Sequence, residues 1–246
     1  MINKTDLKSV ISKYHISGLV EQVKWEIKDN NLAVKFMSPS KEMLGEVKCS
    51  KFPLDDCSFG ISNTTQLVKL IDITKDVIQL STVKVGRICS KLLLADNQFQ
   101  LNYALADILT IPKTGETNFE ESYNIVTTLD SEAISSIIKA QGALTNSETV
   151  VIQPSLSADG EHELELTFGG DVEYANKVSF YLPNLTQQNV PSQYKLHYNS
   201  ELIKEILYCN KDMVSGTLSI NLEGLIKLEF QNGIISSTYY LVQKEI

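Results

Sequence analysis

Few residues of this 246-residue chain have the types and the spacing that catalysis or metal binding requires. His15, His162 and His197 are isolated, and none has a second histidine or a cysteine at the spacing of a metal-binding pair. The acidic residues of Asp55-Asp56 and Asp159-Gly160-Glu161 could bind magnesium, but both stretches have the composition of turns, which favours solvated carboxylates. The chain also lacks a Walker loop, a Gly-x-Gly-x-x-Gly motif and a Gly-x-Ser-x-Gly motif. We therefore predict that the protein is not an enzyme and that it uses no metal or other cofactor.

The four cysteines are far apart in the sequence and form no Cys-x-x-Cys pair. They are Cys49, Cys57, Cys89 and Cys209. We interpret them as reduced, semi-buried cysteines of an intracellular protein rather than as disulfides or metal ligands. The N-terminus has no apolar signal region, and no apolar run approaches the roughly 18 residues that cross a bilayer. The sequence thus predicts a cytoplasmic protein with no membrane partner.

The chain is acidic, with a formal net charge of −8, which at first argues against binding to nucleic acid. This argument is weak, because affinity for phosphate follows the local arrangement of the lysines rather than the total charge. Arg87 is the only arginine, whereas bidentate recognition of guanine edges favours arginine. The composition therefore argues against sequence-specific DNA recognition and leaves non-specific binding open.

The elements that would position any site follow the order helix, strands, helix, strands in the first half of the chain. A helix is predicted to begin near Asn3, which can cap it, because apolar residues recur at helical spacing from Leu7 to Tyr14. Alternating apolar residues predict strands at 23–27, 32–36 and 43–49. A second helix is expected at 62–71, and further strands at 78–80, 91–95 and 99–105.

The second half repeats this order after a polar linker that contains Pro112 and Gly115. We predict a helix capped by Asp130 and stopped at Gly142, and another that begins at 199–201. The predicted strands are 123–129, 150–152, 164–168, 178–182, 217–222, 225–231 and 234–242, the last two joined by an Asn232-Gly233 hairpin turn. The repetition predicts a duplicated α+β domain of ordinary size. A single irregular α+β enzyme domain is the alternative.

Each of the four predicted helices carries one lysine on the side away from its apolar stripe. These lysines are Lys8, Lys69, Lys139 and Lys204. Exposed helix faces usually carry lysine for solubility, so the pattern alone does not establish a function. If the four helices line a common surface, however, the lysines would face the same DNA phosphates. Such contacts give a Kd of only about 10⁻⁴–10⁻⁶ M, so persistence on DNA would require closure around the duplex.

Three segments carry a resemblance to a known family. Leu228 and Phe230 form a Leu-x-Phe strand, which is followed by the strand Tyr239-Tyr240-Leu241 and a short basic–acidic tail. Residues 32–44 have the order strand, Met-Ser-Pro-Ser turn, strand, and residues 123–134 lead from a strand into a helix. In these features the chain resembles the proliferating cell nuclear antigen family of DNA sliding clamps. Its length and helix-first opening also resemble the polymerase clamps of T-even-like phages.

The resemblance implies an α+β protein made of a duplicated clamp domain, with helices packed on antiparallel sheets. It places a first clamp domain at 1–106, an interdomain connecting linker at 107–122 and a second clamp domain at 123–246. It also implies a homotrimer whose six domains form a ring around double-stranded DNA, joined head-to-tail by edge strands. Such a ring is a processivity factor that tethers DNA polymerase and is loaded by an ATP-dependent clamp loader. One alternative is a processivity factor that binds one side of DNA, and another is an α+β protein with no DNA role.

Clamps of this family bind partner peptides, such as the C-terminal peptide of a DNA polymerase, in a groove beneath the linker. The positions that the resemblance implies here are Met37, Leu44, Phe119, Tyr240, Val242 and Gln243. Ordinary core packing is the alternative for Met37, Leu44 and Tyr240. Phe119 is chosen as the nearest apolar residue because we expect the linker to lack the eukaryotic Leu-Gly-Ile-Pro stretch. This departure favours a phage protein, and the lysine-rich, arginine-poor composition indicates an AT-rich genome. The predicted location is the cytoplasm of a bacterial or phage-infected host cell.

Overall fold

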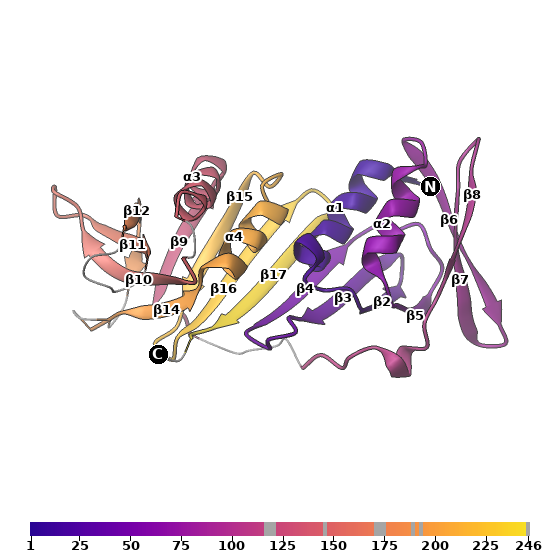
Figure 1. Cartoon of the computed structure of the whole chain (residues 1–246), viewed down its shortest axis with the longest axis horizontal. Helices are drawn as coiled ribbons and strands as arrows, with labels where there is room; N and C mark the ends of the chain where they lie inside the picture. Colours follow the sequence, from indigo (N-terminus) through magenta and orange to yellow (C-terminus); the bar gives the residue numbers. More distant parts are fainter. Residues whose placement is uncertain (116–121, 145–146, 170–175, 188–189, 192–193, 245–246) are drawn as a thin grey trace. The chain divides into compact units, whose positions relative to one another are not determined.

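The computed structural model describes residues 1–115, 122–144, 147–169, 176–187, 190–191 and 194–244. The chain divides into two compact units (Figure 1). Unit 1 comprises Met1–Thr117 and Gly233–Ser237, and unit 2 comprises Asn118–Asn232 and Thr238–Ile246. Within the described ranges, no helix is long and apolar enough to cross a membrane, and no three potential metal ligands gather.

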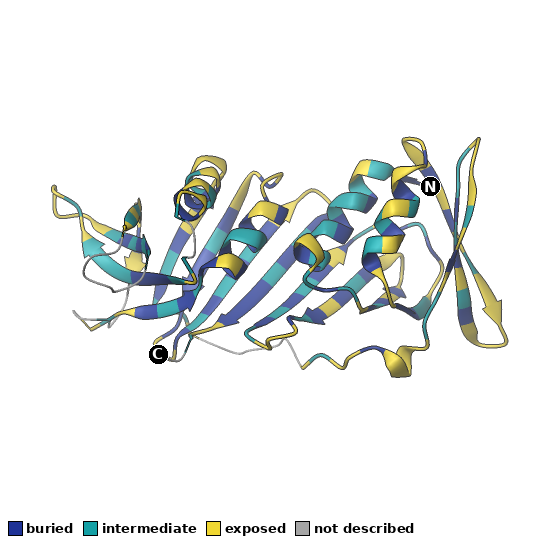
Figure 2. Ribbon diagram, in the orientation of Figure 1, coloured by how far each residue is buried: buried dark blue, intermediate teal, exposed yellow. Residues whose placement is uncertain are grey.

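The first sheet of unit 1 is antiparallel and has the strand order β5-β2-β3-β4. Its strands are β2 (Val23–Lys28), β3 (Asn31–Met37), β4 (Met43–Cys49) and β5 (Cys57–Ile61). Buried residues alternate with more exposed ones along β2 and β3, as the coloured bands in Figure 2 show. Helix α1 (Lys4–His15) packs on the buried face against β3 and β4, and α2 (Thr64–Asp72) packs beside α1. The opposite face is therefore left uncovered by helices.

An aromatic cluster fills the space between α1 and this sheet. The Trp25 ring lies edge-on to Tyr14, with centroids 6.4 Å apart, and edge-on to Phe52, with centroids 5.6 Å apart. The Trp25 indole N–H donates a 3.3 Å hydrogen bond to the Tyr14 hydroxyl, so both buried polar groups have a partner. Such rings each remove about 150–250 Å² from water, which makes this cluster the main attachment of α1.

The second sheet of unit 1 has the order β1-β6-β7-β8, so β8 is an edge strand. Its strands are β1 (Ile2–Asn3), β6 (Val77–Val85), β7 (Ile88–Ala95) and β8 (Gln100–Ala104). After β8 the chain returns to the first sheet, where Ala106 and Gly60 exchange backbone hydrogen bonds of 2.9 and 3.3 Å. A short 3-10 helix, η2 (Ile108–Thr110), follows, and the Asp107 carboxylate caps it by accepting from the Leu109 N–H at 2.9 Å. These contacts fix the start of the linker on unit 1.

Unit 2 has the same kinds of layer. One of its sheets has the order β12-β11-β10-β14, and β13, β9, β15, β16 and β17 are consecutive neighbours in another. The strands are β9 (Ile125–Asp130), β10 (Thr149–Leu156), β11 (His162–Phe168), β12 (Val178–Leu182), β13 (Thr186–Gln187), β14 (Leu196–Asn199), β15 (Ser215–Ile220), β16 (Leu225–Asn232) and β17 (Ile235–Val242). Helices α3 (Ser131–Gly142) and α4 (Ser200–Cys209) contact each other, α3 packs on β9 and β12, and α4 packs on β10 and β14.

The Tyr-Tyr-Leu segment of the last strand holds α4 in place. The Tyr239 side chain is completely buried, and its hydroxyl accepts a 2.9 Å hydrogen bond from the Asn210 side-chain amide. The same amide donates at 2.8 Å to the carbonyl of Ile206 in the last turn of α4. Asn210 thus satisfies a helix-terminal carbonyl and ties the helix end to β17.

The predicted fold class is confirmed: the chain is α+β, and each unit contains two helices packed on antiparallel sheets. The predicted cap Asp130 is confirmed, since its side chain accepts from the Ala133 N–H group at 2.7 Å. The predicted helix start at 199–201 is confirmed as well, and there the Asn199 side chain accepts from the Leu202 N–H group at 3.2 Å. The predicted cap Asn3 is wrong, because its side chain makes no capping hydrogen bond. The residue lies instead in β1, which pairs with β6, so its position is set by the sheet.

Candidate functional site

The outward faces of the helices form the first candidate site. Lys69 on α2 and Lys139 on α3 are exposed, and neither has an ion-pair partner within the described residues. Lys8 on α1 is half-exposed and pairs with Asp72 at the end of α2, with 2.6 Å between Nζ and Oδ1. Both Lys69 and Lys139 therefore present a full positive charge, whereas that of Lys8 is partly offset.

Lys204 on α4 is the most strongly paired of the four predicted lysines. Its Nζ lies 2.5 Å from a carboxylate oxygen of Glu201 and 3.3 Å from one of Glu205. Although burial opposes the charged form, these hydrogen bonds together raise the pKa of Lys204. Two carboxylates against one ammonium give this stretch of α4 a net negative charge, which repels phosphate.

Lys211 is an exposed lysine just after α4, and it contacts an aromatic ring. Its Nζ lies 4.1 Å from the centroid of the Tyr208 ring, a cation–π contact, and both side chains are exposed. Sequence analysis did not select Lys211. The signal that could have identified it is the spacing of three residues between an aromatic residue and a lysine at a helix end.

A polar cluster joins the end of α1 to the start of α2. The Glu21 carboxylate accepts hydrogen bonds from the Thr65 hydroxyl and, at 2.9 Å, from the Thr65 N–H, and it lies 3.1 Å from the His15 Nε2 atom. Partial burial opposes ionisation, but the hydrogen bonds from Thr65 and His15 outweigh it and lower the pKa of Glu21. The cluster fixes the two helices relative to each other, which keeps Lys8 and Lys69 on one surface.

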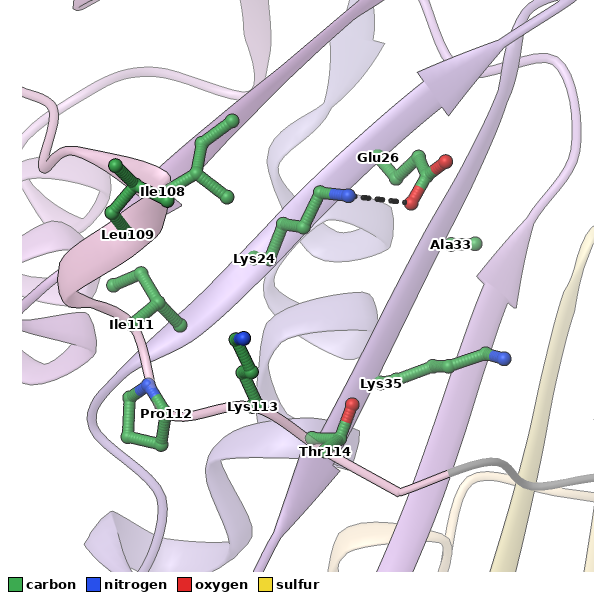
Figure 3. Close-up of a pocket in the computed structure, with 10 residues that line it drawn as sticks. All are labelled: Lys24, Glu26, Ala33, Lys35, Ile108, Leu109, Ile111, Pro112, Lys113 and Thr114. Atoms are coloured by element: carbon green, nitrogen blue, oxygen red, sulfur yellow. Dashed lines mark hydrogen bonds and ion pairs between the residues drawn. The ribbon is translucent and has the colours of Figure 1, made fainter.

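The second candidate site is a groove on the uncovered face of the first sheet of unit 1. Residues 108–114 of the linker run across β2 and β3 there and enclose a cavity of about 390 Å³ (Figure 3). The lining residues are Lys24, Glu26, Ala33, Lys35, Ile108, Leu109, Ile111, Pro112, Lys113 and Thr114. A cavity of this size lies in the range of small-molecule and side-chain binding pockets. We call it the linker groove.

Two of the predicted partner-binding residues lie next to the linker groove. Met37 on β3 and Leu44 on β4 are half-buried and directly opposite each other in the register of the sheet. Met37 is on the same face as Ala33 and Lys35, because side chains two apart in a strand share a face. A Cβ on Gly115 would lie 3.9 Å from the Leu44 side chain, so the linker also covers Leu44.

Three other predicted partner-binding residues belong to unit 2, whereas the linker groove belongs to unit 1. Tyr240 is buried in β17, Val242 ends that strand with 49% of its surface exposed, and Gln243 follows it. All three belong to unit 2. Phe119 lies outside the described residues.

The linker residues that do line the groove were missed by sequence analysis. Leu109 projects with 88% of its surface exposed, while Ile111 is buried against the sheet at 7%. Together with Thr110 and Pro112 they read Leu-Thr-Ile-Pro, which differs from the expected Leu-Gly-Ile-Pro stretch at a single position. The linker thus lacks the Leu-Gly-Ile-Pro stretch itself, but sequence analysis overlooked a form of it that has threonine in place of glycine.

Comparisons with known proteins identify solved structures that share this fold. No model of a known protein family matches the sequence, and no curated protein matches it either. Among solved structures, proliferating cellular nuclear antigen from Entamoeba histolytica has a TM-score of 0.76 at 18% identity, over 99% of this chain and 96% of that one. The antigen from Thermococcus kodakaraensis has a TM-score of 0.74 at 11% identity, over 99% and 98%.

A third similar structure contains a bound partner segment. It is the proliferating cell nuclear antigen of A. fulgidus with the C-terminal region of FEN-1, and it has a TM-score of 0.76 at 15% identity, over 100% of this chain and 97% of that one. Likeness over the whole length of each protein confirms the resemblance at the level of the fold. The chain has the two-domain fold of the sliding clamps of the proliferating cell nuclear antigen type.

Proposed function

We propose that this protein is a DNA sliding clamp, a non-enzymatic processivity factor that encircles duplex DNA as a homotrimer and tethers DNA polymerase and other DNA-processing proteins. The observation that carries the proposal is the full-length match to clamp structures from a protist and two archaea. A chain with two such units needs three copies to supply six. Loading by an ATP-dependent clamp loader belongs to the same proposal, because a closed ring cannot thread onto circular DNA unaided.

The ring would close through the free sheet edges. Strands β8 of unit 1 and β12 of unit 2 are edge strands of five residues each, which supports pairing between β8 of one copy and β12 of the next. Such a head-to-tail contact gives every β8 and every β12 edge a partner once three copies close. Exposed Tyr181 on β12, with 48% of its surface accessible, would be buried in this contact.

Contact with DNA would come from Lys69, Lys139 and Lys211, with Lys8 and Lys204 weakened by their acidic neighbours. These cations read no base sequence and give weak, salt-sensitive attraction to phosphates. Weak contact suits a protein that must move along DNA, since the ring rather than the contacts prevents its release.

Light scattering tests the trimer directly. We expect a mass near three times 27.5 kDa. A mass of 27.5 kDa at high protein concentration would contradict it and favour a processivity factor that binds one side of DNA. Release from linear but not from circular DNA after loading then tests encirclement. Equal release from both would show that the protein does not encircle DNA.

We place partner binding, including that of the polymerase C-terminal peptide, at the linker groove with Met37 and Leu44 beside it. Exposed Ile108 and Leu109 support this, because neighbouring apolar side chains left open to solvent beside a groove are typical of an interaction site. Leu109→Ala is expected to weaken partner binding and to leave the trimer intact. Leu156→Ala is the matched control, since Leu156 is also exposed, at 62%, but lies in unit 2 on β10. Equal loss of binding in both variants would contradict the assignment.

A further inference from the structure

The linker groove has an excess of positive charge that the rest of the molecule does not neutralise. Lys24, Lys35 and Lys113 line it, against the single carboxylate of Glu26. The only ion pair among these four described residues joins Lys24 to Glu26, with 3.0 Å between Nζ and Oε2 (Figure 3). Lys35 and Lys113 are exposed and have no ion-pair partner among the residues that the structure describes. The groove therefore carries two uncompensated cations in a chain of net charge −8.

The register of the sheet makes this excess costly. Lys24 on β2 and Lys35 on β3 are directly opposite each other. Like charges at this cross-strand position destabilise a sheet. On the other side of Lys35 the opposite residue is Glu46, but the Glu46 carboxylate pairs with Lys48 at 2.9 Å. An anion bound at Lys35 would reduce the repulsion.

The remaining walls of the groove are apolar. Ile111 and Ala33 form its floor and Ile108, Leu109 and Pro112 one side. A nucleic acid backbone would gain little from these contacts, because phosphates and sugars prefer polar partners. A peptide that carries both an apolar side chain and a carboxylate would satisfy the two kinds of surface together.

We infer that the linker groove selects acidic–apolar partner peptides, in which an aspartate or glutamate lies next to an apolar residue. Carboxylates of such a peptide pair with the uncompensated ammonium groups of Lys35 and Lys113, and the apolar side chain packs on Ile111 beside Leu109. This inference rests on the proposed function, since it names the class of peptide that the groove of the clamp accepts. Each exposed ion pair contributes up to about a 5-fold gain in affinity, which falls as salt screens it.

The experiment is a selection from a displayed library of random peptides, about 16 residues long, on the full-length protein at low ionic strength, where ion pairs are least screened. Parallel selections use the double variant Lys35→Glu/Lys113→Glu and the control Lys91→Glu. Lys91 lies on β7 in the other sheet of unit 1, is exposed and does not line the groove. Thermal unfolding of each variant confirms that it is folded before selection.

The expected result is enrichment of peptides with Asp or Glu beside an apolar residue on the wild type and on Lys91→Glu. The double variant should lose this acidic preference or favour Lys and Arg. For one selected peptide, replacement of its carboxylates by amides should weaken binding about 5-fold per carboxylate at low salt, and less at high salt.

Three outcomes would overturn the inference, and they differ in meaning. The selected peptides could share apolar residues alone, and their binding could be lost on Leu109→Ala but unchanged in the double variant. That result would refute selection for acidic residues and leave the groove as a partner site. Absence of any peptide sensitive to Leu109→Ala would refute the groove itself and with it this part of the proposed function. Single-stranded DNA could compete with the selected peptides for the wild type, and this competition could be abolished in the double variant. That result would overturn the inference as well, because it would assign the lysines to nucleic acid binding instead.

Discussion

Gly60 allows the linker to dock, and its replacement by alanine is the sharpest test of how the groove is built. Gly60 lies on β5, where a Cβ would be 2.7 Å from Ile111 Cγ1 and 2.9 Å from the carbonyl oxygen of Ala106. Both distances are below the 3.4 Å at which ordinary van der Waals contact begins. The Ala106 oxygen is held by the backbone hydrogen bonds between Gly60 and Ala106, so it cannot rotate away. In Gly60→Ala the start of the linker must therefore retreat by 3.4 − 2.9 = 0.5 Å.

The magnitude follows from overpacking. Insertion of a methyl group into a filled site costs about 1–3 kcal/mol. At about 2–4 °C per kcal/mol for a chain of this size, the melting temperature should fall by roughly 2–12 °C. The retreat also opens the groove at Ile111, so affinity for a groove-binding peptide should fall while the trimer persists.

Calorimetry, amide hydrogen exchange and peptide binding measure the three effects. Gly142→Ala is the matched control, because no atom lies within 4 Å of a Cβ there and the residue ends helix α3. It should be neutral or stabilise by about 0.5–1 kcal/mol. If Gly60→Ala unfolded at the wild-type temperature, with unchanged protection of the Ala106 amide, linker docking would not depend on the close approach at Gly60.

Three other predictions concern the charges and thiols. Lys69→Ala and Lys139→Ala should each reduce the slope of log K against log salt for a short duplex by about 0.9 for each phosphate that the removed lysine had neutralised. Lys204→Ala should change the slope less, because Glu201 and Glu205 neutralise Lys204. Equal effects of the three variants on the slope would contradict this. Hydrogen bonds that outweigh burial lower the pKa of Glu21 from 4.5, so this group stabilises the fold above its unfolded pKa, and that contribution is lost as pH falls through the folded value. Urea unfolding should accordingly show a gap between wild type and Glu21→Gln at about pH 7 that closes below pH 4.5, and a gap that stays constant would refute it. Burial raises the pKa of the Cys57 thiol from 9.0 to about 11. At about pH 8, iodoacetamide should therefore alkylate Cys57 about 100-fold more slowly than a thiol of ordinary pKa, as measured by mass spectrometry. An alkylation rate equal to that of a free thiol would contradict the raised pKa.

Local features of this protein could be predicted from the sequence because they depend on residues close together in the chain. The apolar spacing of Leu67 and Ile71 buries one face of α2, and the caps Asp130 and Asn199 start α3 and α4. Alternation along β2 and β3 indicates the two faces of the first sheet without any knowledge of its neighbours. The resemblance of the Tyr239-Tyr240-Leu241 strand to sliding clamps was confirmed as a likeness of fold.

The candidate sites were harder to predict because they depend on residues far apart. The outward direction of each lysine is a property of its own helix. Whether that lysine forms an ion pair can depend on a second element. Asp72 neutralises Lys8 from another helix, 64 residues away. The linker groove likewise joins residues 24–35 to residues 108–114, and no pattern within either segment indicates the other.

The cysteines show the same division. The sequence shows that no two of them form a Cys-x-x-Cys pair, and three of the four are buried. Yet Cys57 on β5 and Cys89 on β7 are neighbours, because the two sheets of unit 1 meet there, and after burial Cys89 is the next cause of the raised pKa of Cys57.

By itself, then, the sequence determined which face of each helix and strand is apolar, where helices begin, and the kind of fold that such elements form. Periodicity and capping are short-range and survive in any arrangement of the chain. The tertiary structure alone decided which lysines keep their charge free, which linker residues close the groove, and that Lys24 and Lys35 oppose each other across it. These are matters of distance between remote segments, and electrostatic and packing energies depend on that distance.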